Sequence, residues 1–279
     1  MNIHETLGRA SQFAASRRRL AMSTSRKDAR LWLHVGEFKS FIEATGQAYL
    51  FEDDLETRAP TLHPHASASF KAHADATSRQ AMDLLLSSLE KTPEVEPKQS
   101  ITVLVHLANF IFDTGQGSSF EDHVHHRLEY APLAIAHFAT FQEAERWLML
   151  SAEPPSPVYI LVGDDYYMSV YSREDNVRSL YRDFVIEPYI QELTAKGLPS
   201  TVPSFETRSQ AEAWLEGHPA APFGFISIAG ELHFAAHHGK LRRHTLHPVA
   251  ATLTAWEENR RTARSDAVRE VDTGIEGAD

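Results

Sequence analysis

The chain has 279 residues, of which 42% are hydrophobic and 23% are charged, so it can bury a sizeable core and has the length of about two domains. Its formal net charge of −11 argues against a protein that binds nucleic acid through a broad basic surface. The absence of cysteine excludes disulfides, thiol catalysis and thiolate metal sites. No apolar run approaches the roughly 18–20 residues of a membrane span, and the N-terminus lacks an apolar signal-peptide core, so we expect a cytoplasmic protein.

The N-terminal part of the chain has the pattern of a helical domain. Residues 27–44, 77–91 and 100–113 carry apolar side chains at spacings of three and four, which predicts amphipathic helices. The segment 59–76 is rich in proline, histidine and alanine and is expected to be a connector. The sequence KTPEVEPKQ at 91–99 is expected to separate the last two helices.

One motif occurs twice in this helical part. FIEATGQAYLFEDDL at 41–55 returns as FIFDTGQGSSFEDHV at 110–124, within a longer repeat that relates 31–58 to 100–127. In each copy a Thr-Gly pair is expected to end a helix, with the glycine in the left-handed conformation. The phenylalanine that follows is expected to fold back onto that helix, and the motif therefore predicts a structural corner between two helices.

The acidic pairs of this motif, Glu52-Asp53 and Glu121-Asp122, have two interpretations. As structural residues they would lie in the first turn of the next helix, where negative charge is favourable, with Ser118 and Ser119 as candidate N-caps. As functional residues they would be paired acids or metal ligands, but adjacent residues do not share a helix face, which favours the structural interpretation. Gln47 and Gln116 have the least explanation in either case.

A second duplication fills the rest of the chain, where FATFQEAERWL at 138–148 matches FETRSQAEAWL at 205–215. The first copy predicts a strand, a helix, the hairpin PVYILV–YYMSVY and then a helix over 175–196. The elements expected in the second copy are a helix at 207–216, strands at 223–229 and 232–238 around a turn at 230–231, and a helix within 249–264.

The predicted fold is therefore α+β. Residues 1–130 would form a helical bundle of two duplicated helical hairpins. Residues 131–264 would form a pseudo-two-fold β-α-β-β(-α) domain whose repeats, 131–173 and 198–240, superpose. The charged segment 265–279 is expected to be a disordered tail.

Histidine clusters raise the question of a metal site. The candidates are His63 with His65, the group His123, His125 and His126, and the group His237, His238, His244 and His247. No HExxH or related spacing supports a site, and the repeat places unrelated residues at the matching positions, so we expect no metal and no cofactor. The sequence also lacks the GxSxG, Walker A and GxGxxG motifs.

Three functions of different classes remain. The first is a non-catalytic protein-binding module, such as an immunity or antitoxin-type inhibitor, because an acidic chain suits a basic partner. The second is a hydrolase-like enzyme with a site of scattered histidines and acids. The third is a structural or regulatory homo-oligomer, for instance a homodimer joined through a sheet edge or a helix. The expected partner in the first case is another protein, which the sequence does not identify.

The first hairpin provides the candidate binding face. Alternation puts Tyr159 and Leu161 on one face, which we assign to the core because the repeat aligns them with Ile226 and Ile228. The opposite face is also apolar, and its residues are the predicted binding residues Val158, Ile160, Tyr167 and Tyr171. Either the helix at 175–196 or the N-terminal bundle covers this face, or the two tyrosines anchor a partner.

Overall fold

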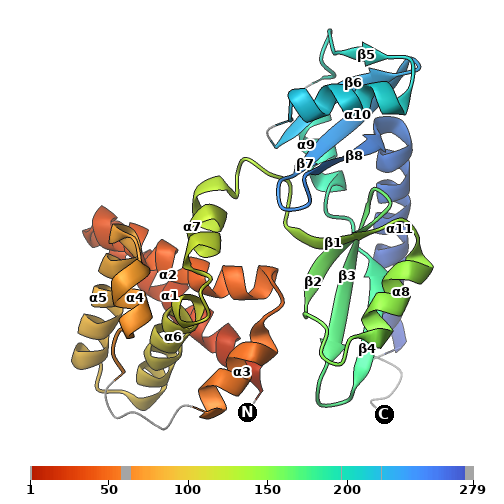
Figure 1. Ribbon diagram of the computed structural model, residues 1–279. Coiled ribbons are helices and arrows are strands. Elements are labelled where there is room, and N and C mark those ends of the chain that lie inside the picture. Colours follow the sequence, from red (N-terminus) through yellow and green to blue (C-terminus); the bar gives the residue numbers. More distant parts are fainter. Residues whose placement is uncertain (1, 58–63, 196, 221, 274–279) are drawn as a thin grey trace. The chain divides into compact units, whose positions relative to one another are not determined.

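The computed structural model describes residues 2–57, 64–195, 197–220 and 222–273. It is α+β, with a helical region followed by a region of mixed sheets and helices (Figure 1). The described residues divide into two compact units. Unit 1 takes them from 1–127, 148–158 and 169–179, and unit 2 takes them from 128–147, 159–168 and 180–279. None of the helices in these ranges is long and apolar enough to cross a membrane.

The helical region contains α1 (Ile3–Thr24), α2 (Arg26–Ala44), α3 (Ala48–Thr57), α4 (Ala68–His73), α5 (Ala76–Lys91), α6 (Val95–Asp113) and α7 (Gly117–His126). Helices were expected at 27–44 and 77–91, and α2 and α5 confirm them. The segment 91–99 was expected to break the chain, yet α6 begins inside it at Val95. Pro97 is tolerated there because the first N–H groups of a helix have no partner within the helix. Within the predicted connector, residues 59–63 lie outside the described residues and α4 occupies 68–73.

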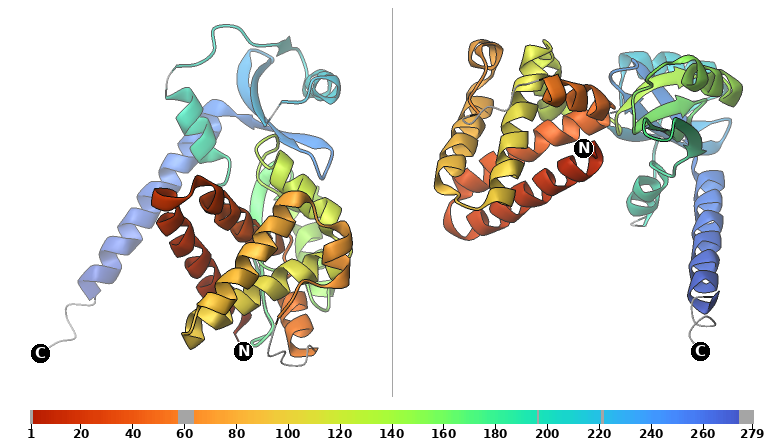
Figure 2. Two further views of the ribbon diagram at one scale, coloured as in Figure 1. Left: turned by 90° about the vertical axis from the view of Figure 1, so that its left-hand side faces the viewer. Right: turned by 90° about the horizontal axis from the view of Figure 1, so that it is seen from below.

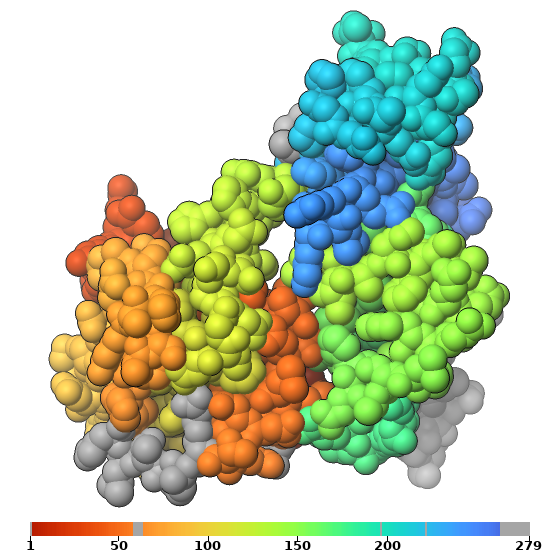
Figure 3. All heavy atoms as spheres, in the orientation of Figure 1, coloured from red at the N-terminus to blue at the C-terminus, as the bar shows by residue number. Residues whose placement is uncertain are grey.

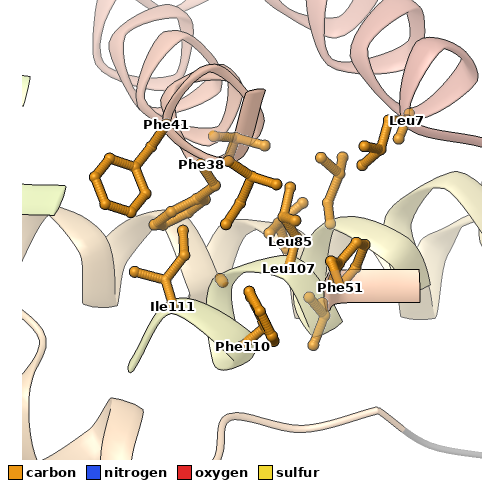
Figure 4. Close-up of a cluster of buried hydrophobic side chains, with 14 of the residues drawn as sticks. Leu7, Phe38, Phe41, Phe51, Leu85, Leu107, Phe110 and Ile111 are labelled. Atoms are coloured by element: carbon orange, nitrogen blue, oxygen red, sulfur yellow. The ribbon is translucent and has the colours of Figure 1, made fainter. Parts of the chain in front are cut away.

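Aromatic side chains from the two copies of the repeat cross over in the core of unit 1. Phe51 packs against Phe110 with ring centroids 5.5 Å apart, and Phe120 packs against Phe41 at 5.7 Å. All four are buried, and Figure 4 shows Phe51 and Phe110 among the surrounding leucines. We expected each corner phenylalanine to fold back onto its own preceding helix. Phe120 does contact Phe112 of α6, with ring centroids 6.4 Å apart, and both phenylalanines also pack on the equivalent helix of the other copy. The crossing makes the two copies one core.

The two corners themselves are helix ends of the predicted kind. Gly46 and Gly115 have φ angles of 68° and 73°, in the left-handed region. The N–H of Gly46 donates to the Glu43 carbonyl at 3.0 Å, and the N–H of Gln47 donates to the Ile42 carbonyl at 2.9 Å. The same two bonds recur in the second copy, at 3.1 and 2.8 Å. This is the Schellman arrangement, which satisfies the last helix carbonyls.

The glutamines of the two corners bind each other. The Nε2 of Gln47 donates to the Oε1 of Gln116 at 2.7 Å, and the Nε2 of Gln116 donates to the Oε1 of Gln47 at 2.7 Å. The second hydrogen of each amide goes to the threonine of its own corner, Thr45 or Thr114, at 2.8 Å. Both amides therefore place all their N–H donors on protein acceptors, and the repeated Thr-Gly-Gln sequence is explained by a reciprocal contact between its own two copies.

Replacing one glutamine of this pair should lower the free energy of unfolding by more than half of the amount lost when both are replaced. Gln47→Met or Gln116→Met leaves the other amide without its partner, and each should lower the free energy of unfolding by about 1–3 kcal/mol. The double variant leaves neither amide stranded, so its cost should fall below the sum of the single costs. Urea denaturation followed by circular dichroism measures all three, with the exposed Gln80→Met as a control of little effect. Strictly additive costs would contradict a direct contact.

The two corner glycines differ in what surrounds them. A Cβ at Gly115 would meet nothing within 4 Å, whereas a Cβ at Gly46 would lie 2.6 Å from the Cβ of Pro155 and 2.7 Å from the N of Ser156. The N–H of Ser156 donates to the carbonyl of Gly46 at 3.2 Å, which holds the 148–158 segment against this corner. Gly46 is thus required both by its backbone conformation and by a close backbone approach.

Alanine at these glycines should separate the two requirements. Gly115→Ala should cost about 1 kcal/mol, from the left-handed conformation alone. Gly46→Ala should cost about 1–3 kcal/mol more, because the added methyl forces the 155–156 backbone away. Thermal or urea unfolding of the two variants provides the comparison. Equal losses of stability in the two variants would mean that the 155–156 backbone moves away from Gly46 without cost.

The acidic pairs do not cap helices. Glu52 and Asp53 lie in the second turn of α3, and the predicted N-caps Ser118 and Ser119 lie inside α7, whose N-cap residue is Gln116. Those two expectations were wrong, because both helices begin directly after the corner. The argument that Glu52 and Asp53 could not act together was also wrong. Both carboxylates reach one guanidinium of unit 1, that of Arg173, at 3.7 and 2.6 Å.

Arg173 also explains why a segment from the middle of the chain belongs to unit 1. Its guanidinium makes two hydrogen bonds with Asp53, at 2.6 and 3.0 Å, and lies 4.7 Å from the ring centroid of Tyr49. A third bond, at 3.0 Å, goes to Glu153. The Tyr49 hydroxyl donates to the carbonyl of Tyr171 at 3.3 Å. A paired arginine and a buried tyrosine therefore fix residues 169–179 to the helices.

The second part of the chain contains β1 (Ala134–Phe138), α8 (Phe141–Leu150), β2 (Val158–Val162), β3 (Asp165–Ser172), β4 (Val177–Arg182), α9 (Glu187–Thr194), β5 (Ser204–Phe205), α10 (Arg208–Gly217), β6 (Phe223–Ile228), β7 (Glu231–His238), β8 (Arg243–Pro248) and α11 (Val249–Thr273). One element order therefore occurs twice, and it gives two four-stranded sheets with the orders β1-β2-β3-β4 and β5-β6-β7-β8. Parallel pairing joins β1 to β2 and β5 to β6. Superposition of 131–173 on 198–240 stays a prediction.

The helix predicted over 175–196 was wrong. Residues 177–182 form β4, and of the described residues 175–195 only 187–194 are helical. Pro188 explains the boundary, because proline is tolerated in the first turn of a helix but not in the middle of one. The strand β8 was not predicted at all. Of the predicted tail 265–279, residues up to Thr273 belong to α11 and 274–279 lie outside the described residues.

The two hairpins are offset by one residue from the alignment used in the sequence analysis. Phe138 pairs with Val162, and its repeat counterpart Phe205 pairs with Ile228. Val162 thus occupies the place of Ile228, although the alignment had matched Leu161 with it. A shift of one residue moves every side chain of a strand to the other face. The analogy with Ile226 and Ile228 therefore used the wrong register, but the assignment of the Tyr159–Leu161 face to the core is confirmed, because Leu161 is buried and Tyr159 packs on the same core.

Both faces of the second sheet are in fact covered. Ala211 and Leu215 of α10 pack on one face, against Ile226, Ile228 and Ala235. The atoms of α10 form the outer surface of this part of unit 2 (Figure 3). The other face belongs to a core that both repeats build, whose buried members are Ala131, Ala134, Leu161, Tyr166, Ile186, Ile190, Phe234, Ala236 and Val249. Unit 2 therefore has one core shared by its repeats and a second core under α10.

Candidate protein-binding surface

The four predicted binding residues do not form one exposed face. Val158, Ile160 and Tyr171 are 2%, 0% and 6% exposed, and only Tyr167 keeps substantial accessible surface. Tyr171 packs against Tyr49 in unit 1, with ring centroids 5.7 Å apart. Tyr167 packs against Phe141 of α8 in unit 2, at 5.6 Å. A binding role for these residues stays a prediction, and a partner could reach directly only Tyr167.

The C-terminal histidines come together, but on two faces of one sheet. β7 and β8 are antiparallel neighbours, and their register places His237 beside His244 and His238 beside Arg243. His237 and His244 stack with ring centroids 4.7 Å apart. His238 and His247 lie on the opposite face, since side chains alternate along a strand. Neither pair resembles a catalytic dyad with an acid at hydrogen-bond distance.

His238 and His247 belong to a buried chain of hydrogen bonds. The Tyr166 hydroxyl donates to the Pro132 carbonyl at 2.6 Å and accepts from His238 Nδ1 at 3.3 Å. The Thr245 hydroxyl donates to His238 Nε2 and accepts from His247 Nε2, both at 2.9 Å. With the bonds in this direction His238 is neutral, because its Nε2 accepts a hydrogen bond, while the Nε2 of His247 carries a proton. Burial lowers the pKa of His238 to about 3 and that of His247 to about 4.

Because of this network, the stability of unit 2 should decrease in acid. Both histidines have folded pKa values below the usual value of about 6.5, so their contribution to stability is complete above that pH and is lost as the pH falls toward 4. Unfolding free energies measured by tryptophan fluorescence should therefore decrease over this range. His247→Gln keeps an N–H donor without a titrating group and should reduce the slope, whereas the exposed His125→Gln should leave it unchanged. An unchanged slope in His247→Gln would contradict the assignment.

The exposed aromatic side chains of unit 2 point to a different surface. Tyr181 of β4 is 52% exposed, and Tyr189 and Leu193 of α9 are 40% and 46% exposed. The positions 189 and 193 are four apart, so their side chains lie on one face of the helix. β4 is the last strand of its sheet. We define these three residues as the tyrosine surface.

Rigid contacts support the tyrosine surface from below. Ile186 and Ile190 anchor α9 in the shared core, and the Tyr189 ring packs against that of Phe223 with centroids 4.8 Å apart and the planes tilted by 44°. The indole N–H of Trp256 donates to the Oε1 of Gln191 at 3.3 Å, which ties α9 to α11. Figure 2 shows the two helices crossing. The exposed rings are therefore held by packed elements and not by a free loop.

Asp183 lies at the edge of this surface. Its N–H donates to the carbonyl of Tyr166 at 3.0 Å, which extends the pairing of β4 with β3 by one residue. Burial raises the pKa of Tyr159 to about 12, and the negative charge of the nearby Asp183 carboxylate adds to the shift. The hydroxyls of Tyr181 and Tyr189 lie close enough to Tyr159 to contribute as well. The phenol of Tyr159 therefore stays neutral at physiological pH.

The neighbouring charges are paired with each other. Arg182 lies 2.9 Å from Asp165 and 3.6 Å from Glu187, and its guanidinium covers the ring of Phe184 at 4.9 Å. Burial raises the pKa values of both carboxylates. Because successive side chains of a strand point to opposite faces, Arg182 faces away from Tyr181 and Asp183. This surface was not predicted from the sequence, because a helix was expected over 175–196 and the alternation of residues 181–183 was therefore not considered.

Other candidate sites in the described chain have less support. No group of three or more His, Asp or Glu side chains converges as a metal site within the described ranges, and His63 lies outside them. A groove of about 950 Å³ runs along α1 and α6 of unit 1, lined by Arg9, Gln12, Phe13 and Lys98 among others. Within the described residues, none of the hydroxyl groups of its lining hydrogen-bonds to Glu96 or Lys98, and that of Thr6 donates to the carbonyl of Asn2. Comparison of the chain with protein families, curated proteins and solved structures finds no match.

Proposed function

We propose that the chain is a non-catalytic protein-binding module that inhibits its partner, in the manner of an immunity or antitoxin protein. The observation that carries this proposal is the tyrosine surface, on which Tyr181, Tyr189 and Leu193 stand 40–52% exposed on packed elements. Rigid aromatic side chains with a polar end are the residue type that most often dominates binding energy at protein interfaces. The surface is therefore the place where a partner would bind.

Charge supports a basic partner. The net charge of −11 would draw a basic protein toward this chain and speed its association. A hydrolase-like function has less support, because His238 and His247 are buried and serve in structural hydrogen bonds. A homo-oligomer would use the same edge strand, and sedimentation of the purified chain distinguishes that case from binding to a different protein.

Charge substitution on the tyrosine surface tests this function. The double variant Tyr181→Arg/Leu193→Arg should weaken binding of a basic partner by at least about tenfold, because it removes two contacts and adds repulsion. Leu20→Arg/Met22→Arg is the matched control, since both residues are exposed in unit 1, at 62% and 64%.

The partner is first captured from lysate with the wild-type chain, identified, and then titrated as a purified protein against all three forms. Selective loss in the tyrosine-surface variant supports the proposal. Equal affinity of the two variants would place the interface elsewhere, and a wild-type chain that associates only with itself would favour the homo-oligomer.

A further inference from the structure

We infer that the rings of Tyr159, Tyr181 and Tyr189 and the carboxylate of Asp183 form a recognition site for a cationic side chain, lysine or arginine, of the partner. This inference rests on the proposed function and makes it more specific. It names the chemical group that the tyrosine surface recognises and the residue that provides the charge.

Geometry brings the four side chains together from three elements. Tyr181 and Asp183 are two residues apart at the end of β4, so they point to the same side of the sheet. Tyr159 comes from β2 and packs edge to face on Tyr166, the residue of β3 that pairs with Asp183, so its hydroxyl lies near the Asp183 carboxylate. Tyr189 comes from α9, which packs on this side of the sheet. The N–H of Asp183 donates to the Tyr166 carbonyl at 3.0 Å, which fixes the backbone that carries the carboxylate.

The negative charge of the Asp183 carboxylate is not paired with a cation inside the described chain. Asp165 and Glu187 share Arg182, but Asp183 makes no ion pair with any lysine or arginine among the residues that the structure describes. The Tyr159 phenol beside it is neutral. Tyrosine ring faces carry negative electrostatic potential and attract ammonium and guanidinium groups. A half-buried carboxylate among tyrosine rings therefore favours a cation over a neutral or acidic ligand.

Unit 1 contains the same chemistry with its cation in place. Arg173 bonds the carboxylate of Asp53 through both of its terminal nitrogens, and the same guanidinium lies over the ring of Tyr49 at 4.7 Å. The unit therefore already combines a tyrosine face, an aspartate and an arginine in one contact. At Asp183 the tyrosines and the aspartate belong to the chain, and we assign the cation to the partner.

A peptide titration tests the inference on the full chain. The probes are fluorescein-labelled ten-residue peptides of alternating arginine and serine, their lysine equivalent, and a version with citrulline, which matches arginine in shape but has no charge. Fluorescence anisotropy gives each dissociation constant. The arginine or lysine peptide should bind at least about tenfold more tightly than the citrulline peptide, because the cation contacts both a carboxylate and aromatic faces.

Two matched variants separate a site from general attraction. Asp183→Asn and Glu192→Gln each remove one negative charge, and Glu192 is exposed on α9. Asp183→Asn should weaken peptide binding about tenfold and Glu192→Gln less than about twofold. Tyr181→Leu should weaken binding while Tyr181→Phe, which keeps the ring, should retain it. Thermal unfolding checks that each variant is folded, and the exposed Tyr181 pair gives a reading even if Asp183→Asn is destabilised.

Equal weakening by Asp183→Asn and Glu192→Gln, or equal binding of the charged and citrulline peptides, would overturn the inference. If those results occur while Tyr181→Arg/Leu193→Arg still abolishes partner binding, the proposed function stands and only the cation site falls. If the peptide binds at Asp183 but the partner is unaffected by the tyrosine-surface variants, the cation site stands and the proposed interface falls.

Discussion

A pair of side-chain amides, Gln47 and Gln116, sets the geometry of unit 1. A partly buried amide has to find partners for two donors and an acceptor, and here each glutamine provides what the other lacks. The contact requires the two helix ends to face each other. That facing places Phe51 on the helix of Phe110 and Phe120 on the helix of Phe41. The hydrophobic core and the polar contact therefore specify the same arrangement.

Apart from the contact between the two corners, the two copies have different surroundings. The first corner receives the 155–156 backbone, and its acids hold Arg173. In the second copy the space around the glycine stays open, and Glu121 accepts from the N–H of Asp75 at 3.0 Å. A repeat thus keeps the residues that its symmetric contact needs, while the surrounding positions acquire separate structural tasks.

Unit 2 joins its two repeats in a different way from unit 1. Its repeats share one core, and they are also joined by charge, because Arg208 of α10 makes two hydrogen bonds with Asp164 in the β2–β3 turn, at 2.6 and 2.9 Å. The candidate binding surface lies at the rim of the shared core, where α9 covers it incompletely. Tyr159 and Tyr166 meet edge to face below that rim, with ring centroids 5.6 Å apart. Tyrosines packed at the edge of a sheet keep part of their rings and hydroxyl groups exposed, and a partner protein would contact those exposed parts.

The sequence by itself determined the α+β class, the helices α2 and α5, and the left-handed glycines of both corners. These features depend on local periodicity and on backbone conformation, which neighbouring residues specify. It did not determine the partner of Gln47, the strand β4, or the burial of Val158, Ile160 and Tyr171. A glutamine's partner lies 69 positions away, and a one-residue shift in a hairpin exchanges its two faces. Tertiary structure alone decided which tyrosines are buried and which are exposed, because burial depends on what packs against a strand and not on the strand's own residues.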